Sequence, residues 1–187
     1  MAVDDKALID LGGKPLIQWT IERAEPQVDE LLINANGDPG RFDRFGRAVI
    51  ADRVSGFLGP LAGVLTGLEW MKENRTRAQW LATFPCDTPF FPHDVVARLI
   101  AKAVEALALV AIAESLGRRH PTFAVWSANI EETADSVLNE GGFRKMEDFV
   151  ESLPYTTVTF PAGAYDPFFN INTFADLSRA QTMIATG

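Results

Sequence analysis

The chain has 187 residues, 47% of them hydrophobic and 22% charged, which is enough for one domain with a sizeable core. A net charge of −8, with no dense run of Lys and Arg, argues against a nucleic-acid partner. No apolar run reaches membrane-spanning length, so we expect no membrane association. The single cysteine, Cys86, excludes an intramolecular disulfide and fits a reducing compartment. Together these features predict a cytoplasmic protein with a single domain over residues 1–187.

In the first half of the chain, apolar segments alternate with amphipathic ones. A strand buried on both faces is expected where Leu31, Leu32 and Ile33 follow one another. The expected order is an apolar segment at 7–11, a helix from Pro15 to residue 24, a strand at 28–35, a short helical piece at 40–46, a strand at 48–51 and a helix at 61–71.

The second half continues the alternation. Its expected order is a strand at 78–84, a helix from Pro92 to residue 104, strands at 107–113 and 121–126, helices at 127–138 and 146–153, a strand at 156–160 and a last helix from Thr173. Strands that alternate with helices at this spacing predict a layered α/β fold with a mainly parallel sheet.

The turn Phe-Pro-Cys-Asp-Thr-Pro at 84–89 is the segment with the clearest chemistry. Asp87 follows a buried strand, and ligands of open α/β sheets bind at the carboxyl ends of strands. A carboxylate in a turn stiffened by two prolines is placed to hold a metal–phosphate complex. The alternative is that Asp87 only caps the turn or the next helix.

Further polar residues follow other predicted strands. Asn34, Asn36 and Asp52 come directly after strands and are expected to converge with Asp87 on one edge of a parallel sheet. Such a set suggests a divalent cation, with Mg²⁺ bound partly through substrate phosphates. Lys6 provides a point charge for a phosphate.

Two other segments are candidates for ligand contact. Gly59-Pro60-Leu61-Ala62-Gly63 opens a helix, and its small residues let a flat ligand approach the backbone. Asn170 and Asn172 stand two residues apart, so in an extended segment they project to the same side. Their carboxamides suit a metal or a ligand hydroxyl, and turn formation is the alternative explanation.

The order of these motifs resembles the molybdenum cofactor guanylyltransferases, over nearly the whole chain. The combination of Gly-Pro-Leu-Ala-Gly, Pro-Cys-Asp-Thr-Pro and Asn-Ile-Asn-Thr is the most specific part of the match. The segments that carry the resemblance are Asp5–Leu8, Leu11–Ile17, Asn34–Asn36, Ile50–Asp52, Gly59–Gly63, Pro85–Pro89, His120–Phe123 and Phe169–Thr173.

The resemblance implies transfer of GMP from GTP to the terminal phosphate of molybdopterin, with release of pyrophosphate and a requirement for magnesium. It implies a three-layer α/β/α, Rossmann-like nucleotidyltransferase fold of the glycosyltransferase-A type. The implied partners are GTP, molybdopterin and molybdoenzyme maturation proteins, and the implied state is a monomer or weak homo-oligomer. By matching position, the implied site consists of Lys6 on the phosphates, Asn34, Asp52 and Gly63 at the nucleotide, Asp87 on magnesium, and Asn170 and Asn172 where the pterin phosphate and metal meet.

The match departs from the family at the N-terminus. The family begins with a strand and a glycine-rich loop, whereas Met1 here aligns with a methionine inside that loop. We therefore expect a shortened form whose sheet lacks its first strand, so that two parallel strands either lose hydrogen-bond partners or pair across the gap, and activity is impaired. Two alternatives remain: a related nucleotidyltransferase that uses CTP or a sugar phosphate, and a non-catalytic molybdopterin-binding protein.

Overall fold

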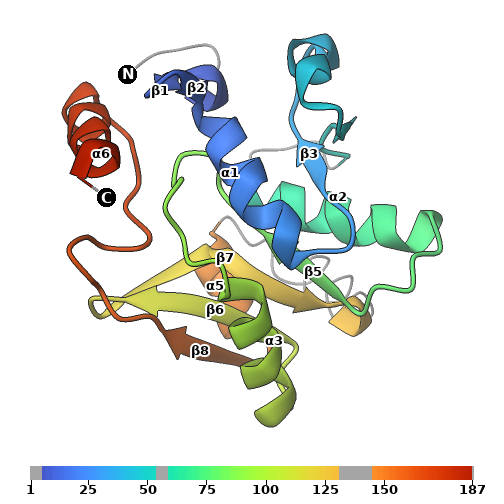
Figure 1. Cartoon of the computed structure of the whole chain (residues 1–187). Helices are drawn as coiled ribbons and strands as arrows, with labels where there is room; N and C mark the ends of the chain where they lie inside the picture. Colours follow the sequence, from blue (N-terminus) through green and yellow to red (C-terminus); the bar gives the residue numbers. More distant parts are fainter. Residues whose placement is uncertain (1–5, 54–58, 131–144, 187) are drawn as a thin grey trace.

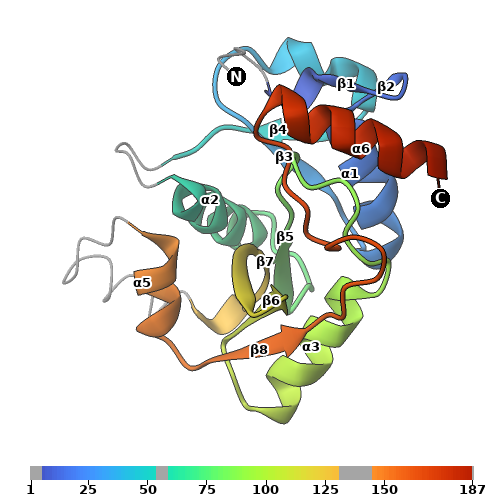
Figure 2. The ribbon, with the colours of Figure 1, turned by 90° about the vertical axis from the view of Figure 1, so that its left-hand side faces the viewer.

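The computed structural model describes residues 6–53, 59–130 and 145–186, and shows three layers with strands in the middle (Figures 1 and 2). Seen edge-on in Figure 2, helices α2 and α5 lie on one side of the strands, and α1 and α3 lie on the other. The α-helices are α1 (Leu16–Ala24), α2 (Pro60–Glu73), α3 (Val95–Glu105), α5 (Met146–Glu151) and α6 (Phe174–Thr186). The 3₁₀ helices are η1 (Lys6–Leu8), η2 (Glu25–Gln27), η3 (Pro39–Phe45) and η4 (Ala128–Ile130).

The larger sheet has four strands in the order β5-β7-β6-β8. β7 pairs antiparallel with both β5 and β6, while β6 and β8 are parallel, so three of the four strands run in the same direction. The strands are β5 (Trp80–Thr83), β6 (Val110–Ser115), β7 (Arg118–Ser127) and β8 (Tyr155–Thr159).

The reversed direction of β7 refines the prediction of a mainly parallel sheet. Only Leu116 and Gly117 separate β6 from β7, and both have positive φ, of 50° and 74°. A two-residue turn with positive φ at both positions joins antiparallel strands, whereas a parallel connection needs a long crossover. The short connection therefore fixes the direction of β7.

The described strands do not form one continuous sheet. β3 (Leu32–Asn34) and β4 (Ala48–Ile50) form a separate parallel pair, and β1 (Asp10–Leu11) and β2 (Lys14–Pro15) form a small antiparallel hairpin. β3 and β5 therefore each have a hydrogen-bonded neighbour on one edge only. The prediction that the strand over 28–35 is buried on both faces is corrected, since Ile33 is the only buried residue of β3.

Side chains on the strands alternate between two helical layers, as a pleated strand requires. On β6, Val110 and Ile112 pack with α2 and α5, whereas Ala111 and Ala113 pack with α3. On β7, Trp126 faces the first of these cores and is fully buried. The four-stranded sheet is thus covered on both faces, which confirms the predicted three-layer α/β/α architecture.

The last helix, α6, does not cover the main sheet. It packs against the β1–β2 hairpin and the start of α1 through a small cluster that contains Leu11, Leu16, Ile171 and Ala180. In Figure 1, α6 accordingly lies beside this hairpin, apart from the four-stranded sheet. The segment before α6 therefore runs from the edge strand β8 back to the N-terminal part of the structure.

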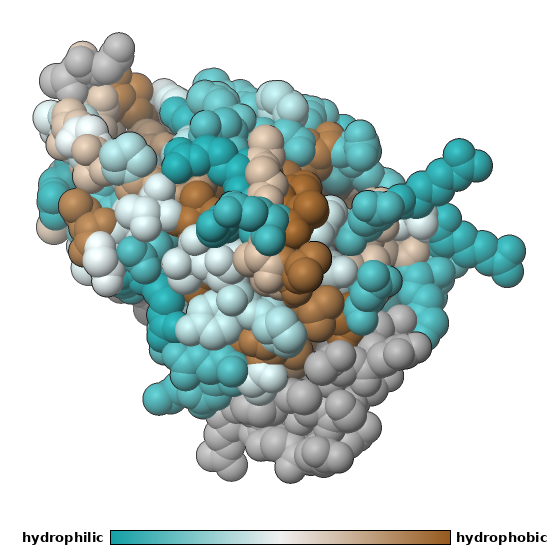
Figure 3. Space-filling model, turned by 90° about the horizontal axis from the view of Figure 1, so that it is seen from below, coloured by the Kyte–Doolittle hydropathy of each residue, from teal (hydrophilic) through white to brown (hydrophobic). Residues whose placement is uncertain are grey.

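The helices expected from the hydrophobic pattern are found at 16–24, 60–73, 95–105, 146–151 and 174–186, while most of the helix expected at 127–138 lies outside the described residues. The face seen in Figure 3 is mostly polar, with a band of apolar residues near its middle. The large exposed hydrophobic residues, such as Leu107, Leu116 and Phe174, come from different elements. In the described ranges, no helix combines the length and apolar character that crossing a membrane requires.

Candidate active site

Three predicted site residues meet at the carboxyl end of β5. The Lys6 Nζ atom lies 2.6 Å from Asp87 Oδ2 and 2.6 Å from Asn172 Oδ1. The Lys6 side chain is 30% exposed and that of Asp87 is 18% exposed, so the ion pair is only partly screened by solvent. The three residues are 81 or more positions apart in the sequence, so only the fold brings them together.

Backbone contacts hold the two oxygen donors in place. Ile171 N donates to the Asp87 carbonyl oxygen at 2.8 Å, which ties the segment before α6 to the turn after β5. The Thr88 hydroxyl donates to Asp87 Oδ1 at 3.2 Å. Thr173 N donates to Asp176 Oδ2 at 2.9 Å and Asp176 N donates back to Thr173 Oγ1 at 3.1 Å, which forms the predicted capping box of α6. The backbone N–H of Asn172 also donates to Asp176 Oδ2, at 3.1 Å.

A second group of predicted residues meets at the ends of β3 and β4. Asn34 Nδ2 donates to Asp52 Oδ1 at 3.0 Å, and Asn36 Nδ2 donates to Asp52 Oδ2 at 2.8 Å. Asp52 N returns a hydrogen bond to Asn36 Oδ1 at 2.9 Å. The parallel register places Asn34 opposite Ile50, so both strands end at the same level. Asn36, which the resemblance does not assign, is therefore as well connected as Asn34.

Gly63, in the first turn of α2, lies against this second group. A Cβ atom at position 63 would be 2.6 Å from Asn34 Oδ1, closer than real Cβ contacts allow. The sequence suggested that small residues at this helix start let a ligand approach the backbone. The structure adds a second reason for glycine, because the Asn34 side chain itself packs against Gly63.

Residues next to members of both groups pack into one hydrophobic cluster. Ala7, next to Lys6, shares a hydrophobic cluster with Ala35, which lies between Asn34 and Asn36. Cys86, next to Asp87, packs against the same cluster. The structure thus brings Asn34, Asn36 and Asp52 together at the ends of β3 and β4, whereas Asp87 belongs to the group around Lys6.

The residues around Lys6 fit a magnesium ion. Two oxygen atoms, Asp87 Oδ2 and Asn172 Oδ1, each lie 2.6 Å from the cationic Lys6 Nζ atom. Carboxylate and carbonyl oxygens are the ligands that Mg²⁺ prefers. In the described part of the chain, no three His, Cys, Asp or Glu side chains are grouped so that they could hold a metal ion. A magnesium ion here would therefore take most of its ligands from phosphate and water.

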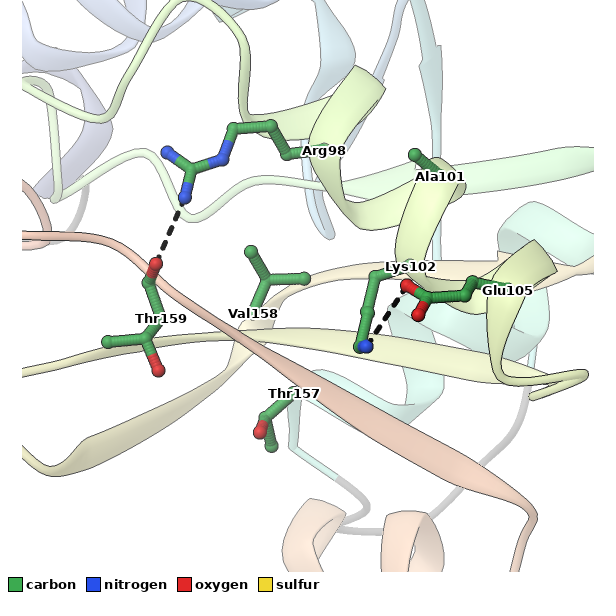
Figure 4. A pocket seen from close by; sticks show the side chains of 7 residues that line it. All are labelled: Arg98, Ala101, Lys102, Glu105, Thr157, Val158 and Thr159. Carbon is green, nitrogen blue, oxygen red and sulfur yellow. Dashed lines mark hydrogen bonds and ion pairs between the residues drawn. The ribbon is translucent and has the colours of Figure 1, made fainter.

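Asn170 and a surface hollow complete the set of candidate features. Asn170 is exposed on the same segment as Asn172. A surface hollow between α3 and β8, lined by Arg98, Lys102 and Thr157 among others, contains none of the predicted residues (Figure 4). In that hollow Arg98 donates to the Thr159 carbonyl oxygen and Lys102 pairs with Glu105, so its cations are already engaged.

The comparison with known proteins identifies the family of this site. A family model for the MobA-like NTP transferase domain matches residues 1–154. The chain belongs to the MobA-like NTP transferase family. A molybdenum cofactor guanylyltransferase from Rhodopseudomonas palustris (strain BisB5) is 42% identical over 181 residues, which cover 97% of this chain and 86% of the relative.

Solved structures of similar fold agree with this assignment. Molybdopterin-guanine dinucleotide biosynthesis protein A from Archaeoglobus fulgidus superposes with a TM-score of 0.72 at 22% identity, over 97% of this chain and 91% of that one. A Mycobacterium tuberculosis H37Rv protein in complex with manganese gives 0.69 at 15% identity, over 97% and 94%. The family match confirms the predicted resemblance, and the superpositions confirm the predicted Rossmann-like nucleotidyltransferase fold.

Proposed function

We propose that this MobA-like transferase transfers GMP from GTP to molybdopterin, giving the guanine dinucleotide form of the cofactor and pyrophosphate. The observation that carries the proposal is the position of Lys6 Nζ between Asp87 Oδ2 and Asn172 Oδ1 at the carboxyl end of β5. A cation and hard oxygen donors at one point are what a triphosphate and its magnesium require. The 42% identity to a molybdenum cofactor guanylyltransferase supports this choice of substrates.

In the proposed reaction, an oxygen of the terminal phosphate of molybdopterin attacks the α-phosphorus of GTP. One P–O bond forms there while the bond to the bridging oxygen of pyrophosphate breaks, and the bonding electron pair leaves with pyrophosphate. The reaction needs positioning and charge neutralisation more than a covalent nucleophile. The partly buried turn at Asp87, with its two prolines, and the paired strand ends meet the first requirement.

In this proposal, Asp87 and Asn172 hold the magnesium ion. When bound, magnesium neutralises the charge of the phosphates and of the departing pyrophosphate. Lys6, released from Asp87, contacts the phosphates directly as a second positive charge. Its side chain is partly exposed, so it can turn toward a ligand without unpacking the core.

The group at the ends of β3 and β4 binds the nucleoside part of GTP. Asp52 provides two acceptor oxygens that Asn34 and Asn36 orient, which suits the hydroxyl and amino donors of a ribose or guanine. Gly63 allows Asn34 to lie close to α2. Asn170 and Asn172 face the molybdopterin phosphate, at the point where both substrates meet.

A pyrophosphate-release assay tests the proposal. The protein is incubated with GTP, molybdopterin and magnesium, and then with each component omitted in turn. Release that requires all three supports guanylyl transfer. Release with CTP in place of GTP would instead support a related cytidylyltransferase, and molybdopterin binding without any release would support a non-catalytic binding protein.

Thermal shifts with magnesium and GTP, CTP or ATP give a second, independent measurement of nucleotide choice. A ligand that binds only the folded protein raises the melting temperature with its concentration. A selective shift with GTP is the expected result. The absence of any nucleotide response would contradict the proposed function.

In the same proposal, the protein acts in the cytoplasm as a single domain and delivers its product to molybdoenzyme maturation proteins.

A further inference from the structure

A buried polar chain links β6 to the segment that carries Asn170 and Asn172. Ser115, the last residue of β6, is completely buried. Its Oγ atom lies 2.6 Å from Asp166 Oδ1 and 2.8 Å from His120 Nε2. None of these three residues has a part in the proposed reaction.

The number of available protons determines the direction of these hydrogen bonds. The Ser115 hydroxyl has one proton, which it donates to the Asp166 carboxylate. Its oxygen must therefore accept from His120, so the imidazole carries its proton on Nε2. Burial lowers the pKa of His120, although the nearby Asp166 carboxylate partly raises it. Donation thus runs from His120 to Ser115 to Asp166.

Asp166 passes this restraint to the segment that follows it. Its Oδ1 atom also accepts from Phe168 N at 2.9 Å, and its carbonyl oxygen accepts from Phe169 N at 3.1 Å. The Phe168 ring is buried and packs on the His120 ring, with 4.8 Å between the ring centroids.

Three residues beyond Phe168, the segment reaches the candidate active site. Ile171 N donates to the Asp87 carbonyl oxygen at 2.8 Å, and Asn172 Oδ1 accepts from Lys6. The segment is therefore held at two points, by Asp166 on one side and by Asp87 on the other, and Asn170 lies between them.

We propose that Ser115 and His120 are positioning residues that set the 166–172 segment, and through it Asn170 and Asn172, for the molybdopterin substrate. The proposal rests on the proposed function for the identity of that substrate. Ser115 cannot touch a substrate itself, because it is fully buried. Its oxygen also accepts from His120, so the imidazole is not arranged as a base that would activate Ser115 as a nucleophile.

The first test compares Ser115→Ala with Ser127→Ala. Ser127 is also buried and ends β7, and its hydroxyl oxygen accepts from Asn129 N, so its loss removes a similar hydrogen bond from the same sheet. We expect Ser115→Ala to raise KM for molybdopterin on the order of tenfold, which corresponds to about 1.4 kcal/mol, with KM for GTP unchanged. Ser127→Ala should leave both KM values unchanged.

The second test separates the donor of His120 from its ring. His120→Gln keeps an N–H donor for Ser115, whereas His120→Phe keeps a ring against Phe168 and loses the donor. Near-normal KM for molybdopterin in His120→Gln, with a raised value in His120→Phe, is the expected pattern. The reverse pattern would show that ring packing, not the hydrogen-bond chain, positions the segment.

Hydrogen exchange of the backbone amides of Phe168 and Ile171 measures positioning without any substrate. We expect faster exchange at both amides in Ser115→Ala than in Ser127→Ala. Unchanged exchange, or equal changes of both KM values in the two Ser variants, would overturn the inference. If the unmodified protein does not use molybdopterin, the proposed function fails, and faster exchange in Ser115→Ala alone would still support the positioning role.

Discussion

At the scale of single residues, Asp87 and Lys6 depend on each other. The carboxylate is partly buried and its nearest cation is the ammonium group of Lys6, at 2.6 Å. A buried charge without a partner is costly, so each group stabilises the other in the absence of substrate. The same pair is suited to open when phosphates and magnesium arrive, because each ion then finds a new partner of opposite charge.

The variant Asp87→Asn tests the metal-binding role. It keeps the size of the side chain but removes the charge that faces Lys6, so we expect turnover to fall about 100-fold or more. The melting temperature should change little, because the Lys6 side chain is 30% exposed and keeps its hydrogen bond to Asn172. Magnesium-dependent pyrophosphate release and thermal unfolding measure the two effects. Asp94→Asn is the control, since Asp94 is exposed and makes no capping hydrogen bond at α3. Normal turnover in Asp87→Asn would remove this residue from the site.

The variant Gly63→Ala tests the nucleoside-binding group. The added methyl group would lie 2.6 Å from Asn34 Oδ1 and would displace the side chain that orients Asp52. We expect the Kd for GTP, measured by calorimetry, to rise roughly tenfold, the effect of about 1.4 kcal/mol.

Gly67→Ala is the matched control for that variant. It lies one turn further along α2 and would bring its methyl group within 2.9 Å of Leu81 Cδ2, in the apolar core. Overpacking there should cost about 1–3 kcal/mol of stability and leave GTP affinity unchanged. Equal losses of GTP affinity in both variants would mean that α2 as a whole, and not Asn34, determines binding.

At the scale of elements, the ends of strands and the segment before α6 carry the chemistry. The ends of β3, β4 and β5 present Asn34, Asp52 and Asp87, while the capping box of α6 fixes the backbone of Asn172 through Asp176. Hydrogen bonds from Thr173 and from the backbone lower the pKa of Asp176, so this cap is fully charged at neutral pH. The helices themselves mainly cover the two faces of the strands.

His120, near the start of β7, makes the stability of the protein depend on pH. Burial lowers the pKa of His120 in the folded protein. As the pH falls below about 6.5, His120 therefore becomes protonated in the unfolded chain before it does so in the folded protein. The contribution of His120 to the free energy of unfolding is therefore present at neutral pH and is lost as the pH falls through this range.

Urea unfolding at about pH 7.5 and about pH 5.5 measures this dependence. We expect the unmodified protein to lose more stability between these two values than His120→Gln, in which Gln does not titrate. The other titrating groups are common to both proteins and cancel in the comparison. An identical loss in the two proteins would show that His120 is protonated equally in the folded and unfolded chains.

At the scale of the whole molecule, the separation of the strands into two sheets is the main feature. The four-stranded sheet has helices on both faces, and β6 is paired on both edges. β3 and β4 are paired only with each other, yet they carry the nucleoside-binding group. The proposed nucleotide side thus rests on the less supported part of the strand layer.

Hydrogen exchange of the native protein tests this difference. We expect the amides of β6 to exchange on the order of 100-fold more slowly than those of β3 and β4, because opening a two-stranded pair breaks fewer buried contacts. Saturating GTP and magnesium should slow exchange in β3 and β4 more than in β6. Equal protection in all these strands would show that they open as one cooperative unit.

Much of the fold could be read from local patterns. The apolar stripes of α2 and α3 and the capping box at Thr173 each depend on residues close in sequence, and each was found where predicted. Asp87 and Asp52 were recognisable because polar residues that directly follow buried strands reach the edge of a sheet. The motif order was sufficient to indicate the family, which the family match confirmed.

Only the tertiary structure decided which of these residues touch. The pairing of Lys6 with Asp87, the close approach of Gly63 to Asn34, and the chain from His120 through Ser115 to Asp166 join segments whose spacing in sequence carries no signal. The direction of β7 was likewise outside the hydrophobic pattern, whereas the single hydrogen-bonded neighbour of β3 and of β5 agrees with the expectation that two strands lose a partner. The physical reason is that periodicity reports which face of an element is buried, whereas contacts between distant segments depend on how whole elements pack.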